Sequence, residues 1–261
     1  MPRANLSRQI WPAIVAHRGA SAAYPENTLQ SFEGAIETGA DVVELDARLT
    51  SDDVVVVMHD GDVAVTTDGT GHVHELTLAA VKALDASNGR GPRIEVPTLE
   101  EALRALSGRA GVNIEIKNMP GEAGFDSPKE RIAEQVVTLL DEVAFQGPVI
   151  VSSFNWLSIE RVRELAPDLP TGFLTIGAID PWAALVYAKS HGHSYVLPQS
   201  PALFEAGGEF VQEAHREGLL VGTWTVDDPE AIARLFEMGV DAVATNDPGM
   251  AVPIRDRFRS A

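Results

Sequence analysis

The chain has 261 residues, no cysteine, and a formal net charge of −18 from 20 basic and 38 acidic residues. Its length is close to the roughly 250 residues of a single α/β barrel. The acidic surface disfavours nucleic acid and anionic membranes as partners, and a phosphate-bearing substrate would require a locally positive pocket. Without cysteine, neither a disulfide framework nor a thiolate metal site can form, so a metal ion would need oxygen or imidazole ligands.

The first apolar stretch, residues 10–16, follows Arg3 and Arg8 and therefore shares two features with a signal peptide. It contains Pro12, however, and leads directly into His17. Cleavage there would remove the first expected core strand, so we expect no signal peptide and a cytoplasmic protein. No apolar run approaches the ~18 residues of a membrane span.

Short β-rich apolar runs alternate with helical patterns along almost the whole chain, which is typical of a parallel sheet. We expect eight strands, at residues 13–16, 42–46, 112–117, 149–153, 171–174, 194–197, 219–225 and 242–244. The pattern predicts a (β/α)8 TIM barrel that forms one catalytic domain over residues 1–261.

The helices between the strands have recognisable ends. Asn27 is expected to cap the first helix and Gly39 to end it. Asp228 and Pro229 have the order of an N-cap and a first helical residue, and Gly239 follows that helix.

Residues 47–93 interrupt the alternation with an apolar run at 54–58, a turn-rich stretch at 66–71 and a helical pattern at 77–84. We interpret this segment as a small insertion subdomain after strand two, and residues 97–106 as the returning barrel helix. No linker rich in Ser, Gly or Pro separates the segment from the rest, so it is embedded in the single domain.

The chain also repeats one helix-to-strand junction, because residues 39–43 resemble residues 239–243. The alignment places Glu44 opposite Ala244 and Asp46 opposite Asn246. The fold evidently accepts a small apolar residue where Glu44 stands, which weakens a purely structural interpretation of Glu44.

Polar residues gather at the carboxyl ends of the strands, where TIM barrels place their active sites. Alternation along a strand puts Glu44 and Asp46 on one face, and Glu115 and Lys117 on one face, which in a barrel points inward. The polar strand ends are His17-Arg18-Gly19, Glu44-Leu45-Asp46, His59-Asp60 and Glu115-Ile116-Lys117.

Three carboxylates at a closed barrel mouth would repel one another unless a cation lay among them. Oxygen ligands without thiolate suit one hard divalent ion, Mg²⁺ or Ca²⁺. Arg18 and Lys117 add positive charge that can bind phosphoryl oxygens. His17 and His59 can exchange protons near neutral pH, and the residues alone leave open which is the acid and which the base.

Two aromatic residues, Phe154 and Trp224, stand at the ends of the fourth and seventh strands. Two interpretations are open for them: packing against the alcohol portion of a substrate, or ordinary packing of the barrel mouth. We assign no role to the five remaining histidines, His72, His74, His191, His193 and His215.

With these motifs the chain resembles the glycerophosphodiester phosphodiesterase family. The match runs in order from residue 16 to at least residue 117 and continues more loosely beyond it. It is carried by His17-Arg18-Gly19-Ala20, Pro25-Glu26-Asn27-Thr28, Glu44-x-Asp46, His59-Asp60, Thr66-Thr67-Asp68-Gly69-Thr70-Gly71, Pro97-Thr98-Leu99-Glu100-Glu101-Ala102, Glu115-Ile116-Lys117, Ser152-Ser153-Phe154, Trp224-Thr225-Val226 and Asn246-Asp247-Pro248.

The resemblance implies roles for the residues at the strand ends. It implies that Arg18 and Lys117 hold the phosphate and that the insertion overhangs the site, as in the family. Val65 stands where relatives often carry an arginine, which leaves the substrate preference open but not the chemistry. The remaining implied roles are one divalent metal on Glu44, Asp46 and Glu115, and an acid/base pair formed by His17 and His59.

The implied activity is metal-dependent hydrolysis of glycerophosphodiesters to glycerol phosphate and an alcohol, on a small-molecule substrate without nucleic acid or stable membrane association. A lysophospholipase D or a sphingomyelinase-D-like enzyme could use the same site, but it would need an apolar rim, and we expect no basic or greasy loop. A non-catalytic sugar-phosphate binding barrel should lack one of the histidines or carboxylates. The oligomeric state stays open, including a homo-oligomer, as does the first nucleophile, water or a substrate hydroxyl.

Overall fold

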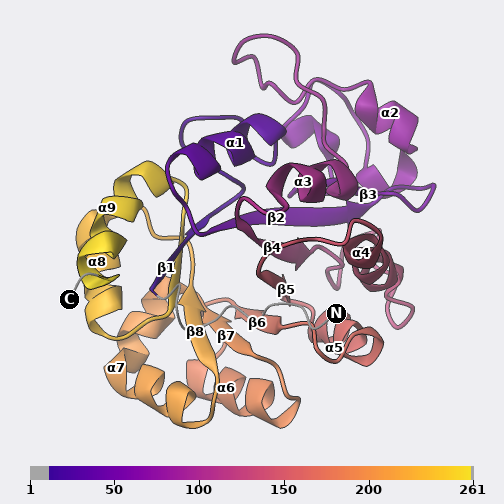
Figure 1. Ribbon diagram of the computed structural model, residues 1–261. Coiled ribbons are helices and arrows are strands. Elements are labelled where there is room, and N and C mark those ends of the chain that lie inside the picture. The colour runs from indigo at the N-terminus through magenta and orange to yellow at the C-terminus, as the bar shows by residue number, and fades with distance from the viewer. Residues whose placement is uncertain (1–11, 260–261) are drawn as a thin grey trace.

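The computed structural model describes residues 12–259 of the chain. Ile10 of the apolar N-terminal stretch, and Arg3 and Arg8 before that stretch, lie outside the described residues. Eight parallel strands form a closed barrel, because β1 pairs with β2 on one side and with β9 on the other. The predicted TIM barrel is therefore confirmed (Figure 1). The barrel strands are β1 (Ala13–Ala16), β2 (Val42–Leu49), β4 (Gly111–Ile116), β5 (Val149–Ser153), β6 (Thr171–Thr175), β7 (Tyr195–Pro198), β8 (Leu220–Thr223) and β9 (Ala242–Thr245).

Helices surround the barrel in the usual alternation with the strands (Figure 1). They are α1 (Leu29–Glu37), α3 (Leu99–Leu106), α4 (Arg131–Glu142), α5 (Trp156–Leu165), α6 (Pro181–Ser190), α7 (Ser200–Arg216), α8 (Pro229–Glu237) and α9 (Pro248–Arg259).

The segment after β2 adds structure outside the barrel. β2 does not stop at Asp46 but continues to Leu49, where it pairs antiparallel with β3 (Val55–Val57). Two short 3₁₀ turns, at Val63–Val65 and Val73–Glu75, and helix α2 (Leu78–Lys82) follow. The segment has an apolar cluster of its own, which includes Val56, Met58, Val63, Val73 and Val81. In Figure 1 it lies beside the barrel, on the side of α3 and α4.

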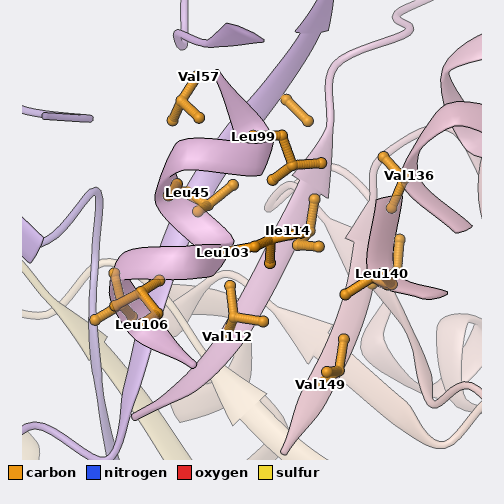
Figure 2. Packing of buried hydrophobic residues seen from close by; sticks show 14 of the residues in the cluster. Leu45, Val57, Leu99, Leu103, Leu106, Val112, Ile114, Val136, Leu140 and Val149 are labelled. Atoms are coloured by element: carbon orange, nitrogen blue, oxygen red, sulfur yellow. The ribbon is translucent and has the colours of Figure 1, made fainter. Parts of the chain in front are cut away.

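The apolar core between strands and helices follows from the alternation of residues along β2 and β4. Leu45 and Ile114 turn outward and are fully buried against Leu99 and Leu103 of α3 (Figure 2). Complete burial of one such side chain stabilises the fold by about 1.5–3 kcal/mol. The opposite faces of the strands fill the barrel interior with a second cluster, Ala13, Val15, Val42, Ile150, Tyr195 and Ala242.

The helix caps show one error of the sequence analysis. Thr28, not Asn27, caps α1, because its hydroxyl accepts a hydrogen bond from Ser31 N at 3.2 Å. Thr28 has the extended backbone that a cap requires, whereas Asn27 is left-handed, with φ of 57°. At α8 the prediction is confirmed: Asp228 accepts from Ala231 N at 2.7 Å, and Pro229 begins the helix.

Candidate active site

The three predicted metal ligands meet inside the barrel mouth. Glu44 and Asp46 come from β2, Glu115 comes from the neighbouring β4, and all three are buried. One carboxylate oxygen from each lies within 4.8 Å of the others. The register explains the proximity, since Asp46 pairs directly with Glu115 across the two strands.

The ionisation of this cluster is strongly coupled. Burial, followed by repulsion from Asp46, raises the pKa of Glu44. Burial also raises the pKa of Glu115, although Lys117 opposes it. For Asp46, burial is again the largest effect, but Lys117 and Arg18 together outweigh it and lower the pKa. Without a further cation the three carboxylates would therefore not all be ionised at neutral pH.

The oxygen atoms of Glu44 show where such a cation fits. Glu44 Oε2 accepts a hydrogen bond from Arg18 N at 2.7 Å. Glu44 Oε1 is buried and accepts no hydrogen bond from any residue between 12 and 259. A buried carboxylate oxygen left without a donor is costly unless a metal ion binds it. The residues present therefore fit a divalent cation.

Two cationic side chains border the carboxylates. Lys117 Nζ lies 3.1 Å from Asp46 Oδ1 and also contacts Glu115. Arg18 Nε lies 3.4 Å from Asp46 Oδ2, and Arg18 Nη1 pairs with Glu26 at 2.9 Å. The locally positive groups that an acidic protein needs for a phosphate are thus present in one place.

The turn after β1 depends on a glycine. Gly19 has φ of 79°, and a Cβ there would lie 2.4 Å from Ser31 Oγ and 2.6 Å from the Ser31 backbone carbon. Ser31 Oγ in turn donates to Arg18 O at 2.9 Å. The close packing of this turn on α1 holds Arg18 over the carboxylates, and Asn27 Nδ2 donates to Asp46 Oδ2 at 2.8 Å.

His17 is held by an amide and a carboxylate. Its Nδ1 lies 2.8 Å from Asn246 Oδ1, and Asn246 Nδ2 donates to Asp227 Oδ2 at 2.6 Å. An ionised carboxylate can only accept, so Asp227 orients the amide and leaves Oδ1 to accept from the His17 Nδ1–H. Neutral His17 therefore has its lone pair on Nε2. Burial, and then Arg18, lowers the pKa of His17, while the bond to Asn246 raises it.

Asn246 and Asp227 were not among the predicted site residues. The sequence nevertheless contained one signal for each of them. The repeated junction placed Asn246 opposite Asp46, and Asp227 directly follows the Trp224-Thr225-Val226 motif. What the sequence could not give is that β1 and β9 are neighbours, which brings Asn246 to His17.

His59 follows β3 and has different neighbours. Its Nδ1 lies 3.3 Å from Asp60 Oδ1, and its backbone oxygen accepts from Arg48 Nε at 2.7 Å. Burial, and then Lys117, lowers the pKa of His59, while Asp46 and Asp60 oppose that effect. The Asp60 carboxylate beside the ring favours its protonated form, although the balance of these effects lowers the pKa.

A cavity of about 100 Å³ joins these groups. Phe154 and Trp224 form part of its wall, with their rings 5.2 Å apart and edge to face. Trp224 Nε1 donates to Leu197 O at 3.0 Å, and Lys117 Nζ lies 5.7 Å from the centre of the Phe154 ring. The other site residues that line the cavity are His17, Arg18, Glu44, His59, Glu115 and Lys117. Val65 lies outside it, on the insertion, with 56% of its surface exposed.

The fold and this cavity define the class of protein: an enzyme of the TIM-barrel architecture, with its polar groups at the carboxyl ends of the strands. Residues 17–250 match the glycerophosphoryl diester phosphodiesterase family. The chain belongs to this family, as the sequence motifs predicted.

Relatives of known sequence agree with this assignment. The glycerophosphodiester phosphodiesterase of Caldanaerobacter subterraneus subsp. tengcongensis is 36% identical, over 90% of this chain and 94% of that protein. A Bacillus subtilis glycerophosphodiester phosphodiesterase is 35% identical, over 90% of this chain and 84% of its own length.

Among solved structures, a phosphodiesterase of Oleispira antarctica in complex with the product sn-glycerol-3-phosphate superposes with a TM-score of 0.84. It is 27% identical, and the match covers 95% of this chain and 98% of the other. Within residues 12–259, no helix is both long enough and apolar enough to cross a membrane.

Proposed function

We propose that this protein hydrolyses glycerophosphodiesters to glycerol phosphate and an alcohol, with one divalent cation and two histidines. One observation carries the proposal: Glu44 and Glu115 of a buried carboxylate triad line a single cavity together with two cationic side chains and two histidines. The relatives named glycerophosphodiester phosphodiesterase and the Oleispira complex with sn-glycerol-3-phosphate support the same substrate class.

Glu44, Asp46 and Glu115 would hold the cation, and hard oxygen ligands favour Mg²⁺ or Ca²⁺. When bound, such an ion supplies charge to neutralise the phosphoryl oxygens and the leaving oxygen. Glu44 Oε1 is buried without a donor among the described residues, so binding of the cation would satisfy this oxygen.

Arg18 and Lys117 would hold the phosphoryl group. Arg18 Nε faces Asp46 Oδ2 at 3.4 Å and Nη1 is paired with Glu26, so the guanidinium is held at the cavity wall, where it can bind a phosphoryl oxygen. Lys117 Nζ lies between two carboxylates and the Phe154 ring, which fixes its position at the cavity wall. Pre-positioned charges of this kind stabilise a transition state without reorganisation.

The contacts of the histidines support different roles for the two. His17 donates through Nδ1 to a neutral amide, so its Nε2 lone pair can take a proton from the attacking water or hydroxyl. His59, beside the carboxylate of Asp60, can carry the proton that the departing alcohol oxygen requires. In net hydrolysis the phosphorus–oxygen bond to the alcohol breaks, and one water oxygen enters the phosphomonoester.

A lipid-directed activity, such as that of a lysophospholipase D, is the second candidate, and one observation favours it. We expected no apolar loop, yet the β6–α6 loop and the first turn of α6 expose Ile176, Ile179 and Trp182, with 50%, 39% and 39% of their surfaces accessible. Trp156, at the start of α5, is 49% exposed. Both segments follow the carboxyl ends of barrel strands, so they lie on the side of the barrel that holds the site.

The test is the release of glycerol phosphate from soluble glycerophosphodiesters, and of acylglycerol phosphate from a lysophospholipid, with each metal and with excess chelator. We expect release from the soluble diesters that depends on Mg²⁺ or Ca²⁺. Full activity in chelator would contradict the metal. Turnover of the lysophospholipid alone would select the second candidate.

A further inference from the structure

A second and larger cavity, of about 560 Å³, lies beyond the barrel mouth. Its walls are the outer end of β2, residues 61–74 of the insertion, the loop after β4 and the start of α4. The β2–β3 hairpin that forms one wall extends beyond the barrel in Figure 1. Lys117 lines both this cavity and the catalytic one, so the two adjoin.

Arg48 ties the larger cavity to the catalytic site. It stands two residues beyond Asp46 on the same face of β2, roughly 6.6 Å further out along the strand. Its Nε donates to His59 O at 2.7 Å, and its two Nη atoms bind Glu122 at 2.6 and 3.2 Å. A group that leaves the phosphate on the side of His59 would therefore face this cavity.

The charges that line the cavity are largely compensated. Arg48 is paired with Glu122, and Arg131 Nε binds Asp126 Oδ2 at 2.9 Å. Of the lining carboxylates only Asp62, which is exposed and accepts from Ala64 N at 2.9 Å, has no cationic partner among the described residues, so a cationic head group would meet one such carboxylate beside two guanidinium groups. Ser51, His72 and His74 contribute hydroxyl and imidazole groups to the wall.

We propose that this cavity binds the alcohol that leaves the phosphodiester, and that it selects uncharged alcohols with several hydroxyl groups, from glycerol to inositol in size. The inference rests on the proposed phosphodiesterase function and adds its substrate preference. Paired ions together with hydroxyl and imidazole groups offer both donors and acceptors, which is what a polyol requires. The volume is within the range of pockets that bind small molecules.

Gly61 allows a steric test. A Cβ at this position would lie 3.5 Å from Arg48 Nη1 and 3.8 Å from Glu122 Oε2, which are ordinary contact distances, and its backbone is not left-handed. Gly61→Leu should therefore fold and extend into the space in front of the Arg48–Glu122 pair. We expect kcat/KM for glycerophosphoinositol to fall at least tenfold relative to kcat/KM for glycerophosphomethanol, whose alcohol is too small to occupy the cavity.

Glu122→Gln tests the polar contacts without filling space. It should lower the same ratio by about tenfold, the effect of losing one hydrogen bond to a charged group. Glu100→Gln is the control, because Glu100 Oε1 accepts from both Nε and Nη2 of Arg104 on the exposed face of α3. It should leave the ratio at its wild-type value.

The outcomes separate the two proposals. If the wild-type protein with metal releases glycerol phosphate from none of the diesters, the proposed function fails. If it hydrolyses them but prefers glycerophosphocholine to glycerophosphoinositol, the selectivity is wrong. If Gly61→Leu and Glu122→Gln both leave the ratio unchanged, the cavity is not the alcohol site. Should Gly61→Leu lose its folded state in thermal unfolding, the ratio measured for Glu122→Gln decides.

Discussion

Replacement of Asn246 by alanine tests whether the proton acceptor is His17. The change removes the 2.8 Å contact that makes Nδ1 the donor and Nε2 the acceptor. A neutral hydrogen bond stabilises its arrangement by about 1 kcal/mol, a factor of about five in the population of the competent tautomer. Loss of a general base altogether lowers rates by about 10²–10⁴. We therefore expect kcat/KM to fall by between about fivefold and about 100-fold.

The pH profile separates this role from a merely structural one. The bond to Asn246 raises the pKa of His17, against burial and Arg18, which lower it. Asn246→Ala should therefore lower that pKa further, and a base that must be unprotonated will stay active at lower pH. The acidic limb of the kcat/KM profile should shift to lower pH.

The control is Ser21→Ala, since Ser21 Oγ lies within hydrogen-bond distance of the same Asn246 oxygen, at 3.0 Å, and of the backbone oxygen of His17, at 2.8 Å, rather than binding the imidazole nitrogen. It should keep the wild-type limb and a rate within about threefold of wild type. An unmoved limb in Asn246→Ala, or a wild-type rate, would refute the reasoning.

Three further predictions follow from the site. Glu44→Ala should fold and lose affinity for the cation, and calorimetry that finds wild-type metal binding would remove it from the ligand set. His17→Ala and His59→Ala should each lower kcat by roughly 10²-fold or more, so steady-state turnover close to wild type in either would exclude that residue from proton transfer. Gly19→Ala should destabilise the protein by about 1–3 kcal/mol, because its Cβ would collide with the Ser31 backbone and φ is 79°. Denaturant unfolding measures this change, and an unchanged midpoint would show that the turn relaxes.

The barrel could be predicted because its signals are local. Apolar strands buried on both faces and helices with Asp-Pro starts and Gly ends repeat at regular intervals, as at Asp228 and Gly239. The inward face of β2 followed from alternation alone, which put Glu44 and Asp46 together. The boundaries were less predictable: β2 continues past Asp46 because β3 pairs with it, a contact between segments that alternation does not report.

The parts that could not be predicted depend on contacts between distant segments. Asn27 looks like a cap in sequence, but its left-handed backbone turns the side chain toward Asp46, 19 residues away. Asn246 reaches His17 across 229 residues only because the barrel closes between β9 and β1. The cavity beside Arg48 requires three segments that share no motif.

The buried acids Glu44 and Glu115 are unfavourable for the fold, and for that reason they are informative about function. Glu44 and Glu115 are buried acids whose pKa is raised, so the native state binds more protons than the unfolded chain above the ordinary carboxylate pKa. By the linkage relation, the stability that these two acids contribute without metal is lost as the pH rises through neutrality. A protein tolerates such a cluster only where something else offsets it. Ala244, at the equivalent junction, shows that the barrel does not need an acid there. A cation that binds only the native state would restore this stability and would also complete the site. The same ion would therefore offset the unfavourable burial of the triad and serve its function.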